Sequence, residues 1–422
     1  MFLPFSRGIA AALVLLSLTV GTRATEDPST EPLRADPSLK RFVRDVALSN
    51  PDVMAASAVL DASGALRDAA ARPLYNPELS AQTESSVDDA RTLGISQTLD
   101  WSGKRQARGD AAERERLIAQ SQYRLSLWTF STQLLTRLAM HQTAMERDQL
   151  ARQAERVMNE FAELAEKRFT AGDINQVDLS LARLAATDAQ IQRATRAGDL
   201  AGAGQAVRAL AVDAPPSAWP QLLTPQPLKP DKNAREPFIH DLPEVRIAQE
   251  RVQLADARVA VRRKAQRPDP TLTLRGGEQA GESLIGLNLS IPLFVRNSFD
   301  NEVRAALAAR SEAQYSSDAV LQRSAARLRS AQERYELLRD AWATWERAGQ
   351  PSLMLQTEQL RQLWQAGEIS TTDYLVQLRQ TIEVQDNAFA LRQALWEGWF
   401  EWLRSSGQIN EWLALDQLLP QQ

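Results

Sequence analysis

The sequence predicts a mainly α-helical fold with a smaller β portion, in which long antiparallel coiled-coil helices and four strands form an internally duplicated chain. Three observations lead to this prediction. The two halves of the 422 residues match in order and spacing. Each half changes from helical to alternating periodicity and back again. A proline-rich connector, which no continuous helix can cross, separates the halves at residues 213–242.

The internal repeat sets the organisation of the chain. Four segments of the first half have counterparts 192 to 195 residues later: 50–53 matches 242–245, 77–79 matches 270–272, 94–99 matches 286–291, and 168–174 matches 363–369. Such a repeat indicates two copies of one structural unit. We therefore expect a first repeat at 25–212, consisting of a helix, a β-hairpin and a long helical hairpin, and a second repeat at 243–422.

The first 24 residues have the pattern of a secretory signal peptide. Arg7 provides a basic start, residues 9–20 are an apolar core, and Thr22-Arg23-Ala24 is a small-x-Ala cleavage site. The apolar core is shorter than the roughly 20 residues that a membrane-spanning helix needs, so export is expected. The chain has no cysteine, which excludes disulfides, thiolate metal sites and a lipid anchor through cysteine.

Each repeat is expected to begin with a helix, at 38–72 and 243–267, and to continue into a β-hairpin. The second strand of each hairpin has apolar side chains at every other position, which is typical of a strand with one apolar face. These positions are Leu93, Ile95 and Leu99 in the first half and Ile285, Leu287, Leu289 and Ile291 in the second. The partner strands are predicted at 79–85 and 272–276.

Long helices follow each hairpin, at 105–167 and 300–362. At 1.5 Å per residue, about 60 residues span roughly 90 Å, which is too long for a compact globule. The first long helix has apolar residues at alternating spacings of four and three, which is a coiled-coil pattern. This seam consists of Leu150, Ala154, Val157, Phe161 and Leu164, and we expect Ile174, Val177, Leu181 and Leu184 to continue it antiparallel. Trp396, Trp399 and Trp402 are predicted to pack in the core.

Four strands with one apolar face cannot close a barrel within one chain, so the strands need partners from other chains. Three copies would supply twelve strands, which is a workable membrane β-barrel with apolar side chains outside and polar side chains inside. The alternative is a soluble two-hairpin domain on a coiled coil.

Composition argues against several other functions. The formal net charge is −4, so nucleic acid is not an expected partner. The two histidines, His141 and His240, are far apart in the sequence, and there is no glycine-rich phosphate loop. We expect His141 to be a surface residue of a solvated helix. The sequence therefore predicts no enzyme, no cofactor and no metal-binding residues.

Two motifs resemble those of a known family. Residues 97–105, Gln-Thr-Leu-Asp-Trp-Ser-Gly-Lys-Arg, and residues 289–297, Leu-Ser-Ile-Pro-Leu-Phe-Val-Arg-Asn, each lie where a strand passes into a long helix. Each half also has a glycine-centred turn followed six residues later by an aspartate. With these motifs, nearly all of the chain after the signal resembles the TolC-type outer-membrane efflux proteins, in particular the heavy-metal branch of CzcC-like and CusC-like proteins.

The resemblance implies a trimeric α/β-barrel channel in the outer membrane of a Gram-negative bacterium, extending into the periplasm. It also implies a periplasmic adaptor and an inner-membrane RND pump as partners, so that the chain is a passive exit duct, with heavy-metal cations as the implied cargo. Drugs and secreted proteins are alternative cargoes. A secreted periplasmic coiled-coil adaptor or scaffold is the alternative from another class of protein.

The resemblance also assigns roles to individual residues. Gly172 and Gly367 correspond to the periplasmic tip turns, and Asp178 and Asp373 to residues near the aperture. The family's second carboxylate, three residues further on, is replaced here by Leu181 and Val376. As acids in the first turn of a helix, both aspartates would also be favourable without facing a lumen. The implied membrane-interface or strand-to-helix positions are Trp101, Gly103, Pro292 and Phe294.

Overall fold

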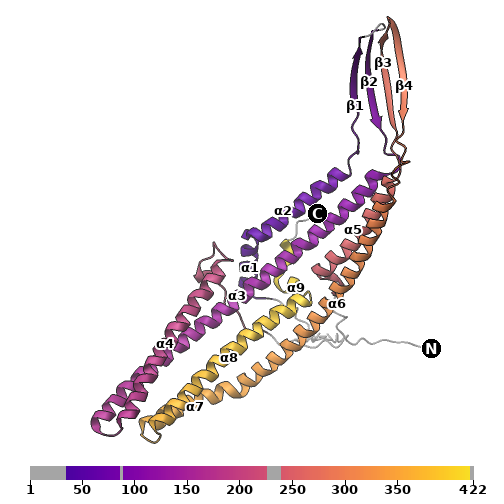
Figure 1. Cartoon of the computed structure of the whole chain (residues 1–422). Coiled ribbons are helices and arrows are strands. Elements are labelled where there is room, and N and C mark those ends of the chain that lie inside the picture. Colours follow the sequence, from indigo (N-terminus) through magenta and orange to yellow (C-terminus); the bar gives the residue numbers. More distant parts are fainter. Residues whose placement is uncertain (1–34, 86–88, 226–238, 419–422) are drawn as a thin grey trace, which may run out of the picture. The chain divides into compact units, whose positions relative to one another are not determined.

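The computed structural model describes residues 35–85, 89–225 and 239–418 (Figure 1). The predicted signal peptide at 1–24 and residues 226–238 of the predicted connector lie outside these ranges.

The first half contains two helices, a β-hairpin and two further helices. They are α1 (Pro37–Ser49), α2 (Pro51–Ala70), β1 (Glu78–Glu84), β2 (Ala90–Thr98), α3 (Lys104–Ala171) and α4 (Gln176–Arg208). The second half has the corresponding elements α5 (Pro243–Ala265), β3 (Thr271–Gln279), β4 (Glu282–Ser290), α6 (Asp300–Thr344), α7 (Gln350–Gln365) and α8 (Thr371–Ser405), followed by α9 (Ile409–Leu413). Single 3₁₀ turns lie at Pro216–Ala218, Ile239–Asp241 and Leu415–Leu418.

The helix predicted at 38–72 is broken into α1 and α2 by Asn50 and Pro51. The Asn50 side chain accepts hydrogen bonds from the backbone N–H groups of Asp52 and Val53, at 3.0 and 3.4 Å, and so caps α2. Pro51 occupies the first helical position, where no backbone N–H is needed. The residue before a proline is disfavoured in the α conformation, which explains the break.

The helix predicted at 300–362 is also interrupted, by a π-helical turn at Trp345–Gly349 between α6 and α7. The indole of Trp345 lies over Gly349, where an added Cβ would be 2.3 Å from the Trp345 ring. The corresponding helix of the first half, α3, runs without a break for 68 residues, which is about 100 Å.

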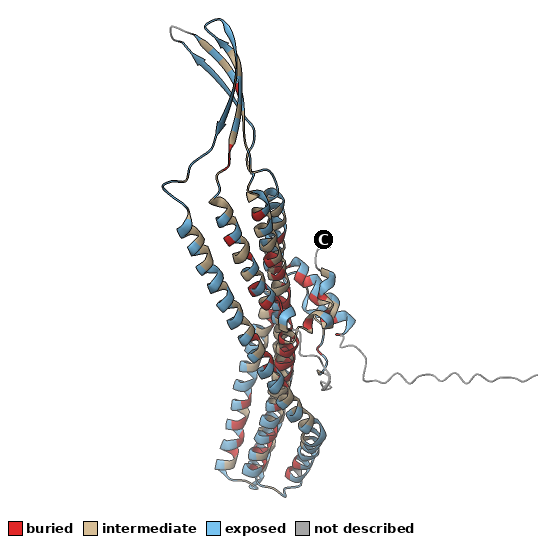
Figure 2. Ribbon diagram, turned by 90° about the vertical axis from the view of Figure 1, so that its right-hand side faces the viewer, coloured by how far each residue is buried: buried red, intermediate tan, exposed pale blue. Residues whose placement is uncertain are grey.

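The helices pack in antiparallel pairs around α3. This helix contacts α2, α4, α5 and α8, and α6 packs between α5 and α8. In Figure 2, buried residues follow the helix contacts, while most of the sheet is exposed. Within the described ranges, no helix combines the length and hydropathy needed to cross a membrane.

The predicted return seam is confirmed at Ile174, which packs against the core cluster, and is wrong at Val177, Leu181 and Leu184, which are exposed. Leu179, Ala182, Ala185 and Ala189 are the buried positions, whereas Val177, Leu184 and Ile191 are exposed. The buried positions include three alanines, whose small side chains allow close approach of the helices. Trp396, Trp399 and Trp402 are buried as predicted, and the rings of Trp399 and Trp402 stack at 5.1 Å.

The four strands form one antiparallel sheet in the order β1-β2-β3-β4. The two repeats are joined in this sheet by the pairing of β2 with β3, from Ala90 opposite Gln279 to Thr98 opposite Thr271. Among the described residues, β1 and β4 pair on one side only, so both outer edges keep unpaired backbone groups.

Candidate functional site

One face of the sheet is apolar and exposed. The register places Leu79, Ile95, Leu274 and Leu287 side by side on this face, with Leu272, Leu289, Leu93 and Ile285 in the adjacent rows. Leu79 is 81% and Ile285 85% exposed. Burying one such side chain is worth about 1.5–3 kcal/mol, so a contiguous surface of this kind indicates contact with an apolar environment.

The opposite face of the same sheet is polar. One row contains Glu78, Ser96, Thr273 and Asn288, and the row at the hairpin end contains Glu84, Ala90, Gln279 and Glu282. Because side chains alternate along a strand, the two faces are chemically separated over most of the sheet. Toward the hairpin ends, Arg91 and Glu278 lie on the apolar face and Leu284 lies on the polar face. One face is suited to lipid and the other to water.

The passage from β2 into α3 is held by backbone and side-chain hydrogen bonds around Gly103. This glycine has a φ of +73° and begins the helix. The Asp100 carboxylate accepts hydrogen bonds from the backbone N–H groups of Lys104, at 2.8 Å, and Arg105, at 2.6 Å. Burial opposes ionisation of Asp100, but these N–H groups and that of Gly103 hold its pKa below the usual value.

Trp101 and Lys264 tie this passage to the second repeat. The indole N–H of Trp101 donates to the Pro268 carbonyl at 2.8 Å, while Trp101 as a whole is 63% exposed. Lys264 donates from Nζ to the Gly103 carbonyl at 2.9 Å. An exposed indole with its N–H satisfied is suited to a membrane interface, the role that the sequence suggested for Trp101.

Asp269 lies at the centre of this junction, and sequence reasoning missed it. Its side chain is only 4% exposed, and its Oδ2 accepts hydrogen bonds from the Tyr75 hydroxyl, at 2.8 Å, and from Lys104 Nζ, at 2.9 Å. The pKa of Tyr75 is raised to about 12. Burial is the largest cause, and the hydrogen bond to Asp269 is the second. The one available signal was the Pro268-Asp269-Pro270 sequence directly before β3.

The second passage, from β4 into α6, is longer and is built differently. Pro292 is exposed in this segment, and the Phe294 ring packs edge-on against Phe299 at 5.1 Å. Phe299 has a φ of +60° immediately before α6. Gln266, which follows α5, donates to the Ser298 carbonyl at 3.0 Å and to Asp300 Oδ1 at 2.8 Å.

The turns at Gly172 and Gly367 end α3 and α7, and each glycine has a positive φ, +84° and +77°. Both are C-terminal helix caps for which glycine is favoured. Asp178 and Asp373 occupy the same position in the first turns of α4 and α8. The Asp178 N–H donates to Asn175 Oδ1 at 2.9 Å, and the Asp373 N–H donates to Ser370 Oγ at 3.1 Å. These hydrogen bonds are typical of acidic residues in the first turn of a helix, which is the alternative role that the sequence also allowed for Asp178 and Asp373.

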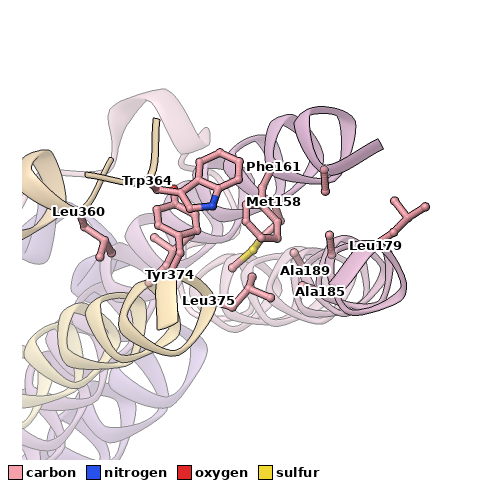
Figure 3. Close-up of a cluster of buried hydrophobic side chains, with 12 residues drawn as sticks. Met158, Phe161, Leu179, Ala185, Ala189, Leu360, Trp364, Tyr374 and Leu375 are labelled. Carbon is pink, nitrogen blue, oxygen red and sulfur yellow. The ribbon is translucent and has the colours of Figure 1, made fainter. Parts of the chain in front are cut away.

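An aromatic cluster joins the two helical hairpins near these turns (Figure 3). The ring centroids of Phe161 on α3, Trp364 on α7 and Tyr374 on α8 lie 4.7 to 5.2 Å apart. Arg168 adds a hydrogen bond to the Trp364 carbonyl at 3.1 Å, and its guanidinium lies 4.9 Å from the Trp364 ring. The cluster therefore links both hairpins close to both turns.

Further along the hairpins, ion pairs connect α3 and α4 with α8. Arg147 and Arg196 both pair with Asp386, at 2.9 and 3.4 Å, and Arg379 pairs with Asp188 at 3.5 Å. A cavity of about 240 Å³ lies beside these pairs, with an apolar wall that includes Leu150, Met158 and Ile382.

The described residues contain no group of three or more histidine, aspartate or glutamate side chains that could hold a metal ion. The expectation that His141 is a surface residue is wrong. His141 is half-buried, and its ring contacts Trp219 edge-on at 4.8 Å. Burial lowers the pKa of His141, and the nearby positive charge of Arg208 lowers it to a smaller extent.

Residues 43–211 match the family model of the outer membrane efflux proteins. The cobalt-zinc-cadmium resistance protein CzcC of Cupriavidus metallidurans is 28% identical over 314 residues, which cover 70% of this chain and 73% of CzcC. The nickel-cobalt-cadmium resistance protein NccC of Alcaligenes xylosoxydans xylosoxydans is 30% identical over 294 residues, which cover 66% of this chain and 65% of NccC.

Solved outer-membrane channels share the fold at low sequence identity. The Campylobacter jejuni CmeC channel is 16% identical, with a TM-score of 0.74 over 96% of this chain and 94% of CmeC. CusC is 18% identical, with a TM-score of 0.72 over 89% of this chain and 93% of CusC. Residues 43–211 therefore resemble the outer membrane efflux proteins, and the chain has the fold of CusC and the CmeC outer-membrane channel.

Proposed function

We propose that this chain is the outer-membrane channel of a tripartite efflux system, a passive exit duct for heavy-metal cations. The observation that carries this proposal is the four-stranded sheet, with an exposed apolar face on one side and a polar face on the other. A sheet of this kind is stable in a bilayer only as part of a closed barrel, because open edges leave backbone groups unpaired in lipid.

The proposed assembly is a homotrimer. Edge strand β4 of one copy would pair with edge strand β1 of the next, so that three copies close a barrel of twelve strands. The apolar faces would then contact outer-membrane lipid, and the polar faces would line the lumen. The exposed apolar residues of α4, Val177, Leu184 and Ile191, have the spacing of a coiled-coil seam and would pack against neighbouring helices in the same assembly.

The helical part would extend into the periplasm, with the turns at Gly172 and Gly367 at its tip. There it would meet a periplasmic adaptor and an inner-membrane RND pump. Asp178 and Asp373 would lie near the aperture. Trp101, Gly103, Pro292 and Phe294 would mark the level at which strands pass into helices, close to the periplasmic membrane surface.

The metal cargo is inferred from the relatives named for cobalt, zinc, cadmium and nickel resistance. The described residues offer no cluster of metal ligands. Selection of the metal would therefore take place in the pump, and the channel would provide a route without a chemical step.

Fractionation and gene deletion test this function. We expect the protein in outer membranes as a trimer that resists SDS until it is heated. Deletion, in a strain without redundant exporters, is expected to lower tolerance to cobalt, zinc and cadmium more than tolerance to hydrophobic drugs. A monomeric soluble periplasmic protein would contradict the channel and favour the adaptor alternative, and loss of drug tolerance alone would reassign the cargo.

A further inference from the structure

The polar face of the sheet carries one arginine, Arg275 on β3. The register places it in a row with Ser80, Gly94 and Gly286, one residue from each strand. The only other basic residue of the four strands, Arg91, points to the opposite face. Arg275 is therefore the one charged residue of this row, and its three neighbours in the row are small.

The structure makes room for the Arg275 side chain. A Cβ added at Gly94 would lie 3.2 Å from Arg275 Cγ and 2.8 Å from Ser80 Oγ, so Gly94 allows the arginine stem to lie across β2. On the other side, nothing lies within 4 Å of the position that a Cβ would take at Gly286. Arg275 is exposed and has no ion-pair partner among the described residues.

The carboxylates on this face are too far away to neutralise Arg275. Glu78 lies two residues along the sheet and two strands across it, about 12 Å away, and Glu84 and Glu282 lie four residues in the other direction, at least about 13 Å away. Salt screens charges over about 8 Å at physiological ionic strength. A positive band therefore lies between two acidic levels on the same face.

We propose that Arg275 is a specificity-determining residue of the channel, which gives the barrel lumen a band that attracts anions and retards cations. This inference rests on the proposed trimer, in which three copies of Arg275 would lie at one level, separated by serine and glycine. No bulky side chain of that row would shield the guanidinium groups from a passing ion. Rings of one charge set the ion preference of other pores in this way.

Planar-bilayer recordings of the purified trimer test the inference. Under a KCl gradient at low ionic strength, R275Q is expected to raise the ratio of K⁺ to Cl⁻ permeability about threefold, and R275E to raise it further. R275K keeps the charge and should retain the unmodified ratio. R91Q removes one positive charge per chain from the other face and is the matched control, expected to leave the ratio unchanged.

Inorganic pyrophosphate, added on the side of the hairpin ends, provides a second measurement. It should reduce the current of the unmodified channel, of R275K and of R91Q, but not that of R275Q. Equal selectivity and equal pyrophosphate block in R275Q and the unmodified channel would overturn the role of Arg275 and leave the channel function standing. If the unmodified trimer forms no conducting channel, the proposed function itself fails, and this inference fails with it.

Discussion

At the junction between strands and helices, Asp269 connects three segments that are distant in sequence. Its Oδ2 receives hydrogen bonds from Tyr75 and Lys104, whereas its Oδ1 has no partner among the described residues. The pair with Lys104 is largely withdrawn from solvent, since the two side chains are 4% and 16% exposed. Removal of one partner from such a pair is costly, because the other charge is left without compensation.

Replacing Asp269 with asparagine is therefore expected to lower the free energy of unfolding by about 3 kcal/mol. The measurement is urea denaturation of the trimer in detergent. D256N is the matched control, because Asp256 pairs with Arg310 on the exposed surface of α5, where a lost ion pair costs about 0–1 kcal/mol. An equal loss of unfolding free energy in D269N and D256N would show that the burial of Asp269 does not increase its contribution to stability.

Tyr75 gives the same junction a pH dependence. Its pKa is about 12 in the folded chain, above the ordinary value of 10.0, because burial and the neighbouring Asp269 disfavour the phenolate. A raised pKa means that the contribution to stability is complete below pH 10 and is lost as the pH rises toward 12. Y75F should cost about 1 kcal/mol at neutral pH and should weaken the decline between pH 10 and 12.

Thermal melts across this pH range measure both effects. The buried Tyr335 and Tyr374 also have raised pKa values and are unchanged in Y75F, so part of the decline should remain. A decline of the same size in Y75F and the unmodified chain would contradict the role of Tyr75.

Among the elements, the π-helical turn at Trp345–Gly349 distinguishes the second repeat from the first. The Trp345 ring occupies the space in which a side chain at position 349 would lie. G349A should therefore destabilise the chain by about 1–3 kcal/mol through overpacking. When W345A removes the ring, G349A should instead stabilise the helix by about 0.5–1 kcal/mol, because alanine is the better helix former.

A double-mutant cycle, measured by chemical denaturation, shows whether the effect of G349A on the free energy of unfolding changes sign when Trp345 is removed. G198A on α4 is the control for helix propensity alone, since nothing lies within 4 Å of a Cβ at that position. A cost for G349A that persists in the W345A background would show that the ring is not its cause.

The elements also show which features a single sequence can predict. Strand alternation around Ile285 and Leu287 led to the correct hairpin, and the coiled-coil spacing around Phe161 led to the long helix, because both patterns reflect one dominant contact surface. The return seam on α4 was wrong because Ala182 and Ala185 give a weaker hydrophobic signal than Val177 and Leu184. The larger apolar side chains of Val177 and Leu184 favour a core position, although in one chain they are exposed.

The residues of the candidate site also differ in whether a single sequence can predict them. The glycine turns at Gly172 and Gly367 were visible in the sequence, because a positive φ at a helix end favours glycine. Asp269 and Arg275 were not, since their roles depend on contacts and on strand register between segments distant in sequence.

At the scale of the whole molecule, the duplication places Asp178 and Asp373 at the same point of both hairpins, six residues after Gly172 and Gly367. Three copies would bring six carboxylates to the proposed aperture. Like charges gathered there would attract cations and would repel one another. The ring would act at the end of the duct opposite to the Arg275 band, so the two should affect selectivity independently.

The double variant D178N/D373N removes all six charges with little change in side-chain size. The capping bonds to the backbone N–H groups of both residues come from Asn175 and Ser370, so these helix starts should survive. We expect single-channel recordings to show weaker cation selectivity and reduced block by multivalent cations, most clearly at low salt, where screening is weakest. Unmodified selectivity and block in this variant would identify both aspartates as helix-start residues that face solvent.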